Sequence, residues 1–395
     1  MNIDELQKKD SQYLLQNYSR VWVDFERGSN ARLWTREGRE FIDFGSGIGV
    51  CSVGHANPRL NAALNEQLSK LTHISNLYAN ALQARLAERI VGLSGMDMRV
   101  FFSNSGAEAN ECAIKIARKF GESSGGRYKI ITLESSFHGR TIATLKATGQ
   151  VKMHQFFGPF PDGFVIAKDI AEVYELLDGK TCGVMLELVQ GEGGVCALPQ
   201  DEVRALERHL KERNVLLMVD EVQSGVYRSG RFLASQVYGV CPDVISLAKG
   251  LGGGIPIGAT LTNLKDIFGY GDHGSTFGGN FLSMRSGLEV LEILEGQQRE
   301  IARKIEIFGL ELERVLQKYP DLFIESTGLG LMRGLRAKSQ GIWEVVLKSA
   351  FDEGVLVLKS GQSVVRFLPA LTISDEEIAE GFVRFQRACE KLARG

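Results

Sequence analysis

The stretch from residue 215 to residue 254 most constrains what this chain of 395 residues can fold into. It contains two short apolar runs, of which one ends in an acid at Asp220 and the other in an amine at Lys249. Short runs that are rich in Val, Ile and Leu and bounded by polar residues or Gly are typical of fully buried strands in a parallel sheet. Ligands bind at the carboxyl ends of strands in open α/β sheets, so one site could hold both side chains.

A lysine and an aspartate at neighbouring strand ends suit the chemistry of pyridoxal 5'-phosphate (PLP). The amine can form a Schiff base with the cofactor, and the carboxylate can keep the pyridine nitrogen protonated so that the ring accepts electrons. The alternative for Asp220 and Lys249 is an ordinary ion pair or two unrelated charges, because acids and amines are common at polar strand ends. These two residues leave both interpretations open, so the rest of the chain must decide.

The composition is that of an ordinary globular protein and narrows the choice of partners. Hydrophobic residues make up 44% and charged residues 24%, and the net charge of -2 gives no reason to expect nucleic acid or an anionic membrane as a partner. Residues 1–12 lack the apolar core of a signal peptide, and no apolar run approaches the length of a membrane-spanning helix. Six scattered cysteines without a CxxC pair favour reduced thiols over a metal site. We therefore expect a cytoplasmic protein that binds neither nucleic acid nor metal.

The order of the elements predicts an α/β protein with a large and a small domain. From about residue 80, strands and helices alternate, which favours a doubly wound sheet. Short strands with a Gly turn form an antiparallel unit over 21–44, and one long helical segment over 280–318 leads out of the large domain. Ser374 and Glu377 form a capping box for the last helix. The expected parts are an N-terminal arm and antiparallel unit (1–50) that joins the small domain, a large domain (51–285) and a C-terminal small domain (286–395).

A turn between a strand and a helix in the large domain suits a phosphate. The run Arg99–Phe102 predicts a strand, and the turn 103–108 then opens a helix that continues to about Phe120. Free N–H groups and the helix dipole favour an anion at such an N-terminus. The alternative is a plain N-cap by Asn104 or Ser105.

Two further loops carry groups that could meet a ligand. Phe137 offers a ring face for stacking and Arg140 a guanidinium for a carboxylate, both directly after a predicted strand. The loop 273–280 consists mainly of hydroxyl residues and glycines and suits an oxyanion. His55 and His73 could be ligands or bases, but single histidines near loops are more often structural.

In their order along the chain, these segments resemble the class III aminotransferases of PLP fold type I, most closely those that act on acetylornithine. The resemblance covers nearly the whole chain, from Asn17 to the last helix. Its motifs are HISNLYAN at 73–80, FFSNSGAEANE at 101–111, SFHGRT at 136–141, VQGEGG at 189–194, VDEVQSGVYRSG at 219–230, SLAKGLGGGIPIGA at 246–259, GSTFGGN at 274–280 and RFLPALTIS at 366–374. It implies a large domain with a mostly parallel seven-stranded sheet flanked by helices, and a smaller α+β domain built from both termini. Leu188 and Phe281 stand where the family usually has proline, and both changes affect the stiffness of the backbone in these loops more than the reacting groups.

The resemblance implies the cofactor contacts residue by residue. Lys249 would form the Schiff base and then move the proton, and Asp220 would pair with the pyridine nitrogen. Val222 and Phe137 would pack on the two ring faces, and Gln223 would reach the ring hydroxyl. The phosphate contacts would come from Ser105, Gly106, Ala107 and, from a neighbouring subunit, Thr276. A homodimer with shared sites is therefore implied.

The resemblance implies substrate contacts in which positively charged arginines bind the carboxylates of the substrates. The donor reacts at a terminal amine far from its α-carboxylate, whereas glutamate reacts at its α-amine, so one pocket must accept both. Arg140 would bind the donor's α-carboxylate and later the side-chain carboxylate of glutamate. Arg366 would bind the α-carboxylate of glutamate, and Glu192 would neutralise Arg366 when the donor is bound. The remaining implied contacts are Asn76, Tyr78 and Ser275.

The implied reaction is a ping-pong transfer of the δ-amino group of N2-acetylornithine to 2-oxoglutarate, in arginine biosynthesis. Aminotransferases for ornithine, succinylornithine, N-succinyl-diaminopimelate and 4-aminobutyrate are the alternatives within the class, since they share the lysine, aspartate and arginine framework. A non-catalytic PLP-binding regulator is the alternative from another class, although it need not retain Lys249. A dinucleotide-binding dehydrogenase would need a GxGxxG between a first strand and helix, which this sequence lacks.

Overall fold

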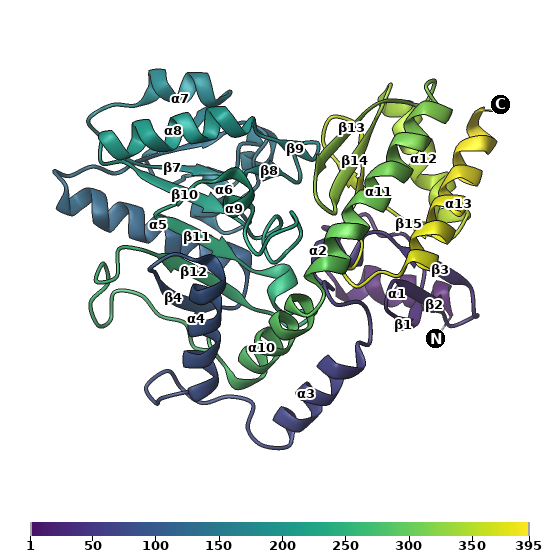
Figure 1. The fold of residues 1–395 in the computed structure, drawn as a ribbon, viewed down its shortest axis with the longest axis horizontal. Helices are drawn as coiled ribbons and strands as arrows, with labels where there is room; N and C mark the ends of the chain where they lie inside the picture. Colours follow the sequence, from purple (N-terminus) through teal and green to yellow (C-terminus); the bar gives the residue numbers. More distant parts are fainter. Residues whose placement is uncertain (1, 394–395) are drawn as a thin grey trace.

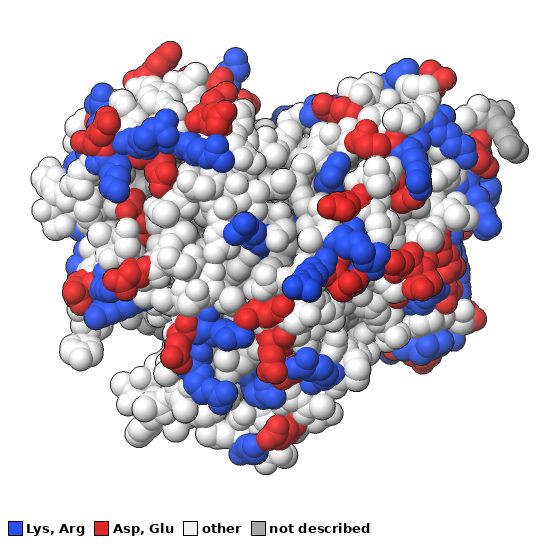
Figure 2. Space-filling model, viewed as in Figure 1, with Lys and Arg blue, Asp and Glu red and all other residues white. Residues whose placement is uncertain are grey.

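The computed structural model describes residues 2–393 and contains two lobes (Figure 1). The larger lobe, blue to green, is built around one sheet, and the smaller lobe contains both the N-terminal and the C-terminal segments. Lysines and arginines are interspersed with acidic side chains over both lobes on the face shown in Figure 2. Among the described residues, no helix is both long and apolar enough to cross a membrane.

The sheet of the large lobe has seven strands, as predicted. Their spatial order is β4 (Arg99–Ser103), β12 (Gly258–Thr262), β11 (Val244–Leu247), β10 (Leu216–Asp220), β7 (Thr181–Leu186), β5 (Lys129–Leu133) and β6 (Phe164–Ala167). β12 alone runs opposite to the other six strands, so the prediction of a mostly parallel sheet is confirmed. Every residue of β7, β10, β11 and β12 is buried, which explains their continuous apolar runs.

Helices cover both faces of this sheet. They are α4 (Ala81–Ser94), α5 (Gly106–Ser123), α6 (Ile142–Ala147), α7 (Ile170–Leu176), α8 (Gln200–Glu212) and α9 (Ala234–Tyr238). Successive strand residues point to opposite faces, so Ile130 of β5 packs in the cluster that contains α5, whereas Ile131 packs with α7 and α8. The predicted helix after the turn 103–108 is confirmed as α5.

The small lobe joins the two ends of the chain. One sheet contains β1 (Phe25–Ser29), β2 (Arg32–Thr35), β3 (Glu40–Asp43) and β15 (Val355–Leu356), and another contains β13 (Phe323–Leu329), β14 (Met332–Ala337), β17 (Val364–Phe367) and β16 (Leu358–Ser360). β15 pairs with β3 in parallel, so both termini build this lobe as expected. Its helices include α1 (Ile3–Tyr13), α12 (Gln340–Asp352) and α13 (Asp375–Ala393). The Ser374 and Glu377 capping box is present, with reciprocal hydrogen bonds of 2.8 and 3.2 Å.

Two predicted elements differ in the structure. The segment expected as one helix over 280–318 forms α10 (Phe281–Glu295) and α11 (Gln298–Lys318), which Gly296 and Gln297 separate. The first strand begins at Phe25 and not at Val21, because the pairing of β1 with β2 starts at Phe25 and the Val21 side chain is exposed.

The remaining short elements connect these layers. They are α2 (Ser46–Gly49), α3 (Pro58–Leu68), the 3₁₀ turns η1 (Val151–His154) and η2 (Lys249–Leu251), and the strand pair β8 (Val189–Gln190) and β9 (Cys196–Ala197). Asn57 caps α3 and Pro58 opens it. The division of the chain near residues 50 and 285 remains our proposal.

Candidate active site

The two residues that the opening stretch predicted lie at one edge of the sheet. Asp220 is the last residue of β10, and Lys249 opens η2 directly after β11. The two strands are parallel neighbours, with Asp220 paired in register with Ser246. Both side chains therefore emerge where the strands of an open α/β sheet bind ligands.

These side chains line a cavity of about 380 Å³. Nine predicted site residues line it, namely Ser105, Gly106, Ala107, Phe137, Arg140, Asp220, Val222, Gln223 and Lys249. They come from the start of α5 and from the loops that follow β5, β10 and β11, all at the same edge of the sheet. The topology thus gathers residues that are up to 144 positions apart.

Three hydrogen bonds orient the Asp220 carboxylate, which is 4% exposed. Oδ2 lies 2.7 Å from Nδ2 of Asn110 and 2.8 Å from Nδ1 of His138, and Oδ1 accepts the N–H of Val222 at 3.0 Å. Asn110 and His138 were not among the predicted site residues. Their types are ordinary in a helix and a loop, and only the folded chain brings them to Asp220.

The Lys249 amine faces the cavity from a left-handed backbone position with φ 41°. Burial lowers the pKa of this amine, and the negative charges of Asp220 and Glu192 partly offset that effect. A lowered pKa increases the fraction of neutral amine, which is the form that attacks a carbonyl carbon.

Glu187 is a further buried acid of the site that the sequence prediction missed. It follows β7, lines the cavity and accepts the N–H of Phe137 at 2.8 Å. Burial, together with the charge of Asp220, raises the pKa of this carboxyl to about 7. An acid directly after a buried apolar run is the pattern that singled out Asp220, so the same signal could have found Glu187.

The N-terminus of α5 forms an anion-binding end of the cavity. Ser105 is the N-cap, and its Oγ accepts the N–H of Glu108 at 3.2 Å. The first N–H groups of a helix have no partner inside it, so those of Gly106 and Ala107 are available to an anion. Helix capping and anion binding are therefore compatible at this turn.

The residues around this cavity fit PLP. An amine, a buried carboxylate and a helix N-terminus meet in one space, and these are the groups that an aldehyde, a pyridine nitrogen and a phosphate require. Residue 106 also has to be glycine, because a Cβ there would lie 2.7 Å from a methyl carbon of Val222.

An ion pair lies beside Gln223 at the small-lobe side of the site. Nη1 of Arg366 is 2.7 Å from Oε1 of Glu192 and donates to Oε1 of Gln223 at 3.1 Å. Arg366 is 2% exposed, so its charge requires a partner. Arg140 is exposed, and its guanidinium carbon lies 5.5 Å from the ring centroid of Phe137. The cavity thus has one paired and one accessible guanidinium close to it.

Besides Glu192 and Arg366, four predicted site residues do not line this cavity. Ser275 and Thr276 line a separate space of about 330 Å³, and Oγ of Ser275 accepts Nδ2 of Asn104 at 3.1 Å. Asn76 donates to the carbonyl oxygens of Ser275 and Gly278, and the Tyr78 side chain is exposed. The loops 73–80 and 274–280 therefore pack against each other beside the cavity of their own chain, without lining it.

The two histidines with an uncertain role also lie outside the cavity. Nε2 of His55 is 2.7 Å from Oδ2 of Asp43, and this contact raises the pKa of His55 to about 10. The His73 ring packs 5.2 Å from the ring of Phe277. Neither histidine lines the cavity that Lys249 faces.

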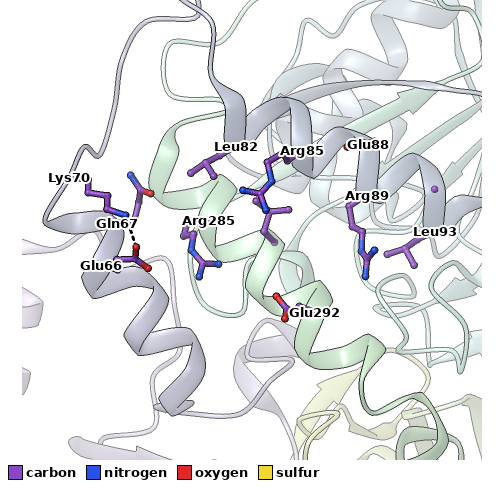
Figure 3. Close-up of a pocket in the computed structure, with 12 residues that line it drawn as sticks. Glu66, Gln67, Lys70, Leu82, Arg85, Glu88, Arg89, Leu93, Arg285 and Glu292 are labelled. Atoms are coloured by element: carbon purple, nitrogen blue, oxygen red, sulfur yellow. Dashed lines mark hydrogen bonds and ion pairs between the residues drawn. The ribbon is translucent and has the colours of Figure 1, made fainter.

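A larger cavity of about 1070 Å³ lies between α3, α4 and α10 (Figure 3). Its walls carry charges of both signs, of which Lys70 pairs with Glu66 at 2.5 Å, and Arg285 of the wall pairs with Glu289 outside the lining at 3.0 Å. None of the predicted site residues lines it. Size alone therefore does not identify the reactive site of this chain.

Comparison with known proteins identifies the family. The chain matches the family model described as Aminotransferase class-III over residues 13–389. It is 62% identical to a Wolinella succinogenes protein named acetylornithine aminotransferase (97% of this chain, 99% of the relative), and 42% identical to a Pseudomonas aeruginosa protein named succinylornithine transaminase/acetylornithine aminotransferase (97% and 96%). The fold is similar to an ornithine aminotransferase from Toxoplasma gondii whose structure is described with partial occupancy of PLP at the active site (TM-score 0.93, 32% identity, 99% and 95% covered).

Proposed function

This chain belongs to the class-III aminotransferases, and we propose that it transfers the δ-amino group of N2-acetylornithine to 2-oxoglutarate. Like its family, the enzyme depends on PLP. The observation that carries the reaction type is the single cavity in which Lys249, Asp220 and the N-terminus of α5 meet. Support for the donor comes from the 62% identity to the W. succinogenes protein named acetylornithine aminotransferase. The proposed biological role is a step of arginine biosynthesis.

Each residue of the cavity has a part in this proposal. When bound, PLP supplies an electron sink for the electron pair that remains after a proton leaves the substrate carbon. Lys249 holds the cofactor covalently and then carries that proton, for which its lowered pKa suits it. Asp220, held by Asn110 and His138, keeps a positive charge on the ring nitrogen. Phe137 and Val222 pack against the ring, Gln223 meets its hydroxyl, and Ser105, Gly106 and Ala107 bind the phosphate.

The two arginines account for a pocket that accepts two different substrates. While acetylornithine reacts, Arg140 binds its α-carboxylate and Glu192 keeps Arg366 neutralised at 2.7 Å. When glutamate or 2-oxoglutarate binds, its α-carboxylate displaces Glu192 from Arg366. A bidentate carboxylate contact is strong enough to drive that exchange, because Arg366 is 2% exposed and its charge requires a partner.

The position of Thr276 supports the proposal of a homodimer with shared sites. Thr276 is exposed and lies outside the cavity of its own chain, which fits a phosphate contact made in the neighbouring subunit. Leu77, Tyr78 and Phe277 expose 89%, 65% and 60% of their surface on the two loops beside it. Apolar side chains gathered in this way mark an association surface. Asn76, Tyr78 and Ser275 would then meet the substrate in the partner's site. We place this dimer in the cytoplasm.

Half-reaction rates of the PLP enzyme with each donor test the proposed substrate. We expect the kcat/KM for acetylornithine to exceed those for ornithine and 4-aminobutyrate at least about tenfold, a difference of about 1.4 kcal/mol. Succinylornithine is the second candidate, because of the 42% identical P. aeruginosa relative that carries both names. A preference for ornithine or 4-aminobutyrate would contradict the proposal.

A PLP-binding regulator remains the rival from another class. Lys249→Ala separates the two, because a regulator needs no covalent catalyst. The wild-type protein should be yellow, bleach with amine donor and recover with 2-oxoglutarate, whereas turnover by the variant should fall at least about a thousandfold. Unchanged turnover in the Lys249→Ala variant would contradict the proposed mechanism.

A further inference from the structure

Arg228 is a buried guanidinium at the junction of the two lobes. Its side chain is 2% exposed and lies in the loop that follows β10. Nη1 donates to the carbonyl oxygens of Leu331 at 3.2 Å and Pro369 at 2.5 Å, while Nη2 is buried and has no hydrogen-bond partner within residues 2–393. Burial lowers the pKa of Arg228 to about 9, so the group stays charged near neutral pH. A buried charge that meets only neutral acceptors destabilises the fold, and a neutral side chain would avoid that cost.

The two carbonyl groups belong to one sheet of the small lobe. Leu331 lies in the turn between β13 and β14, and Pro369 lies two residues beyond the end of β17. β17 carries Arg366, which pairs in register with Gly334 of β14. The guanidinium of Arg228 thus holds the turn before β14 and the exit of β17, which lie opposite each other at one end of the strand pair that presents Arg366.

The backbone at Arg228 reinforces this contact. The N–H of Leu331 donates to the carbonyl oxygen of Arg228 at 2.9 Å. Gly330 has a left-handed φ of 63°, and a Cβ there would lie 2.3 Å from the same oxygen. Only glycine at position 330 permits so close an approach to the Arg228 carbonyl group. The sequence therefore supplies both the arginine and the glycine that this contact requires.

The same loop also reaches Arg366 directly. Gln223, five residues before Arg228, accepts a hydrogen bond from Nη1 of Arg366 at 3.1 Å. The loop therefore meets the small-lobe sheet at two places: Gln223 contacts Arg366, and Arg228 contacts the carbonyl groups of Leu331 and Pro369. We propose that Arg228 is a positioning residue that fixes strand β17 so that Arg366 stays aimed at the substrate's α-carboxylate. This inference rests on the proposed role of Arg366.

Arg228→Lys and Arg228→Met in the PLP-loaded enzyme test this role. Lysine keeps a charge but lacks the planar fork that reaches two carbonyl groups, and methionine keeps only the packing. We expect two constants to rise at least about tenfold in both variants: the dissociation constant for glutarate, an unreactive five-carbon dicarboxylate, and the Michaelis constant for the acceptor 2-oxoglutarate. The half-reaction with acetylornithine, whose carboxylate is assigned to Arg140, and the cofactor absorbance should stay within about threefold of wild type.

Arg333→Lys is the matched control. Arg333 is also partly buried and donates to the carbonyl oxygen of Thr327 and to Ser326 Oγ, but all three residues belong to the small-lobe sheet. The affinity of the Arg333→Lys variant for glutarate should match that of the wild-type enzyme.

Two results would overturn the positioning role of Arg228. One is an unchanged glutarate affinity in Arg228→Lys, which decides the matter even where Arg228→Met does not fold. The other is an equal loss in both half-reactions together with loss of the cofactor, which is the signature of a merely structural residue. If wild type binds glutarate but does not use acetylornithine, and Arg228→Lys still weakens glutarate binding, the proposed donor is wrong and the positioning role stands.

Discussion

Glu187 places a carboxyl behind Phe137 at the end of β7, where burial opposes its ionisation. The side chain is 5% exposed. Burial and then the nearby charge of Asp220 raise the pKa of this carboxyl from its ordinary 4.5 to about 7. The folded state therefore binds this proton more tightly than the unfolded chain does. The Glu187 contribution to stability is fully present below pH 4.5 and is lost as the pH rises through about 7.

Glu187→Gln removes this titration but keeps an oxygen that can accept the Phe137 N–H. We expect the melting temperature of the variant, relative to wild type, to increase between pH 4.5 and about 7, by the equivalent of at most about 3 kcal/mol. Thermal unfolding of the cofactor-free proteins over this range measures the difference. Glu292→Gln is the control, because that side chain is 68% exposed. Parallel curves for wild type and Glu187→Gln would show that the carboxyl does not titrate in this window.

For single residues, the sequence predicts those that a local pattern marks and misses those whose role depends on contacts with residues far away along the chain. Asp220 and Lys249 each end an apolar run, and that local pattern singles them out without knowledge of the residues that they contact in the folded chain. His138 and Asn110 matter because they bond to Asp220, from 82 and 110 positions away. Those contacts depend on how β5, β10 and α5 pack, which spacing along one segment does not contain.

Among the elements, α5 can bring its N-terminus to the cavity because residue 106 lacks a side chain. A Cβ at Gly106 would lie 2.7 and 2.9 Å from the two methyl carbons of Val222. Gly106→Ala should therefore move the N-terminus of α5, which would bind the PLP phosphate, away from Val222, which would pack on the PLP ring. We expect the dissociation constant for PLP to rise at least about tenfold, which an absorbance titration of the cofactor-free protein measures.

Gly92→Ala in α4 is the matched control for this change. A Cβ at Gly92 meets nothing within 4 Å, so only the helix propensity changes. That exchange should stabilise the protein by up to about 1 kcal/mol and leave the PLP affinity unaltered. Equal PLP affinities in both variants would show that the contact between Gly106 and Val222 does not shape the site.

Element boundaries are predictable where a local signal marks them. The capping box at Ser374 fixes the start of α13, and the apolar runs locate β10 and β11. The break between α10 and α11 is also marked, because Gly296 is the C-cap of α10 and glycine is a common helix-terminating residue. The prediction of one helix over 280–318 passed over this signal, because apolar helical spacing continues on both sides of Gly296.

Across the whole molecule, the pairing of distant segments is what local patterns leave open. β3 and β15 are parallel neighbours, with Ile42 opposite Val355 in the register. Alternating strands near residue 40 predict an antiparallel unit but not a partner more than 300 residues away. Here the family resemblance supplied the expectation that both termini build one lobe, and the observed sheet agrees with it.

The proposed dimer makes a prediction that only the whole assembly can test. Thr276 lies outside the cavity of its own chain, so each site would combine Lys249 of one chain with Thr276 of the other. Lys249→Ala and Thr276→Glu should each inactivate a homodimer, the first by removing the amine and the second by opposing the phosphate charge. Random reassociation of the two variants makes half of the dimers hybrids with one intact site, so about a quarter of wild-type activity should return. If Thr276 served its own chain, every site in the mixture would lack one group and no activity would appear.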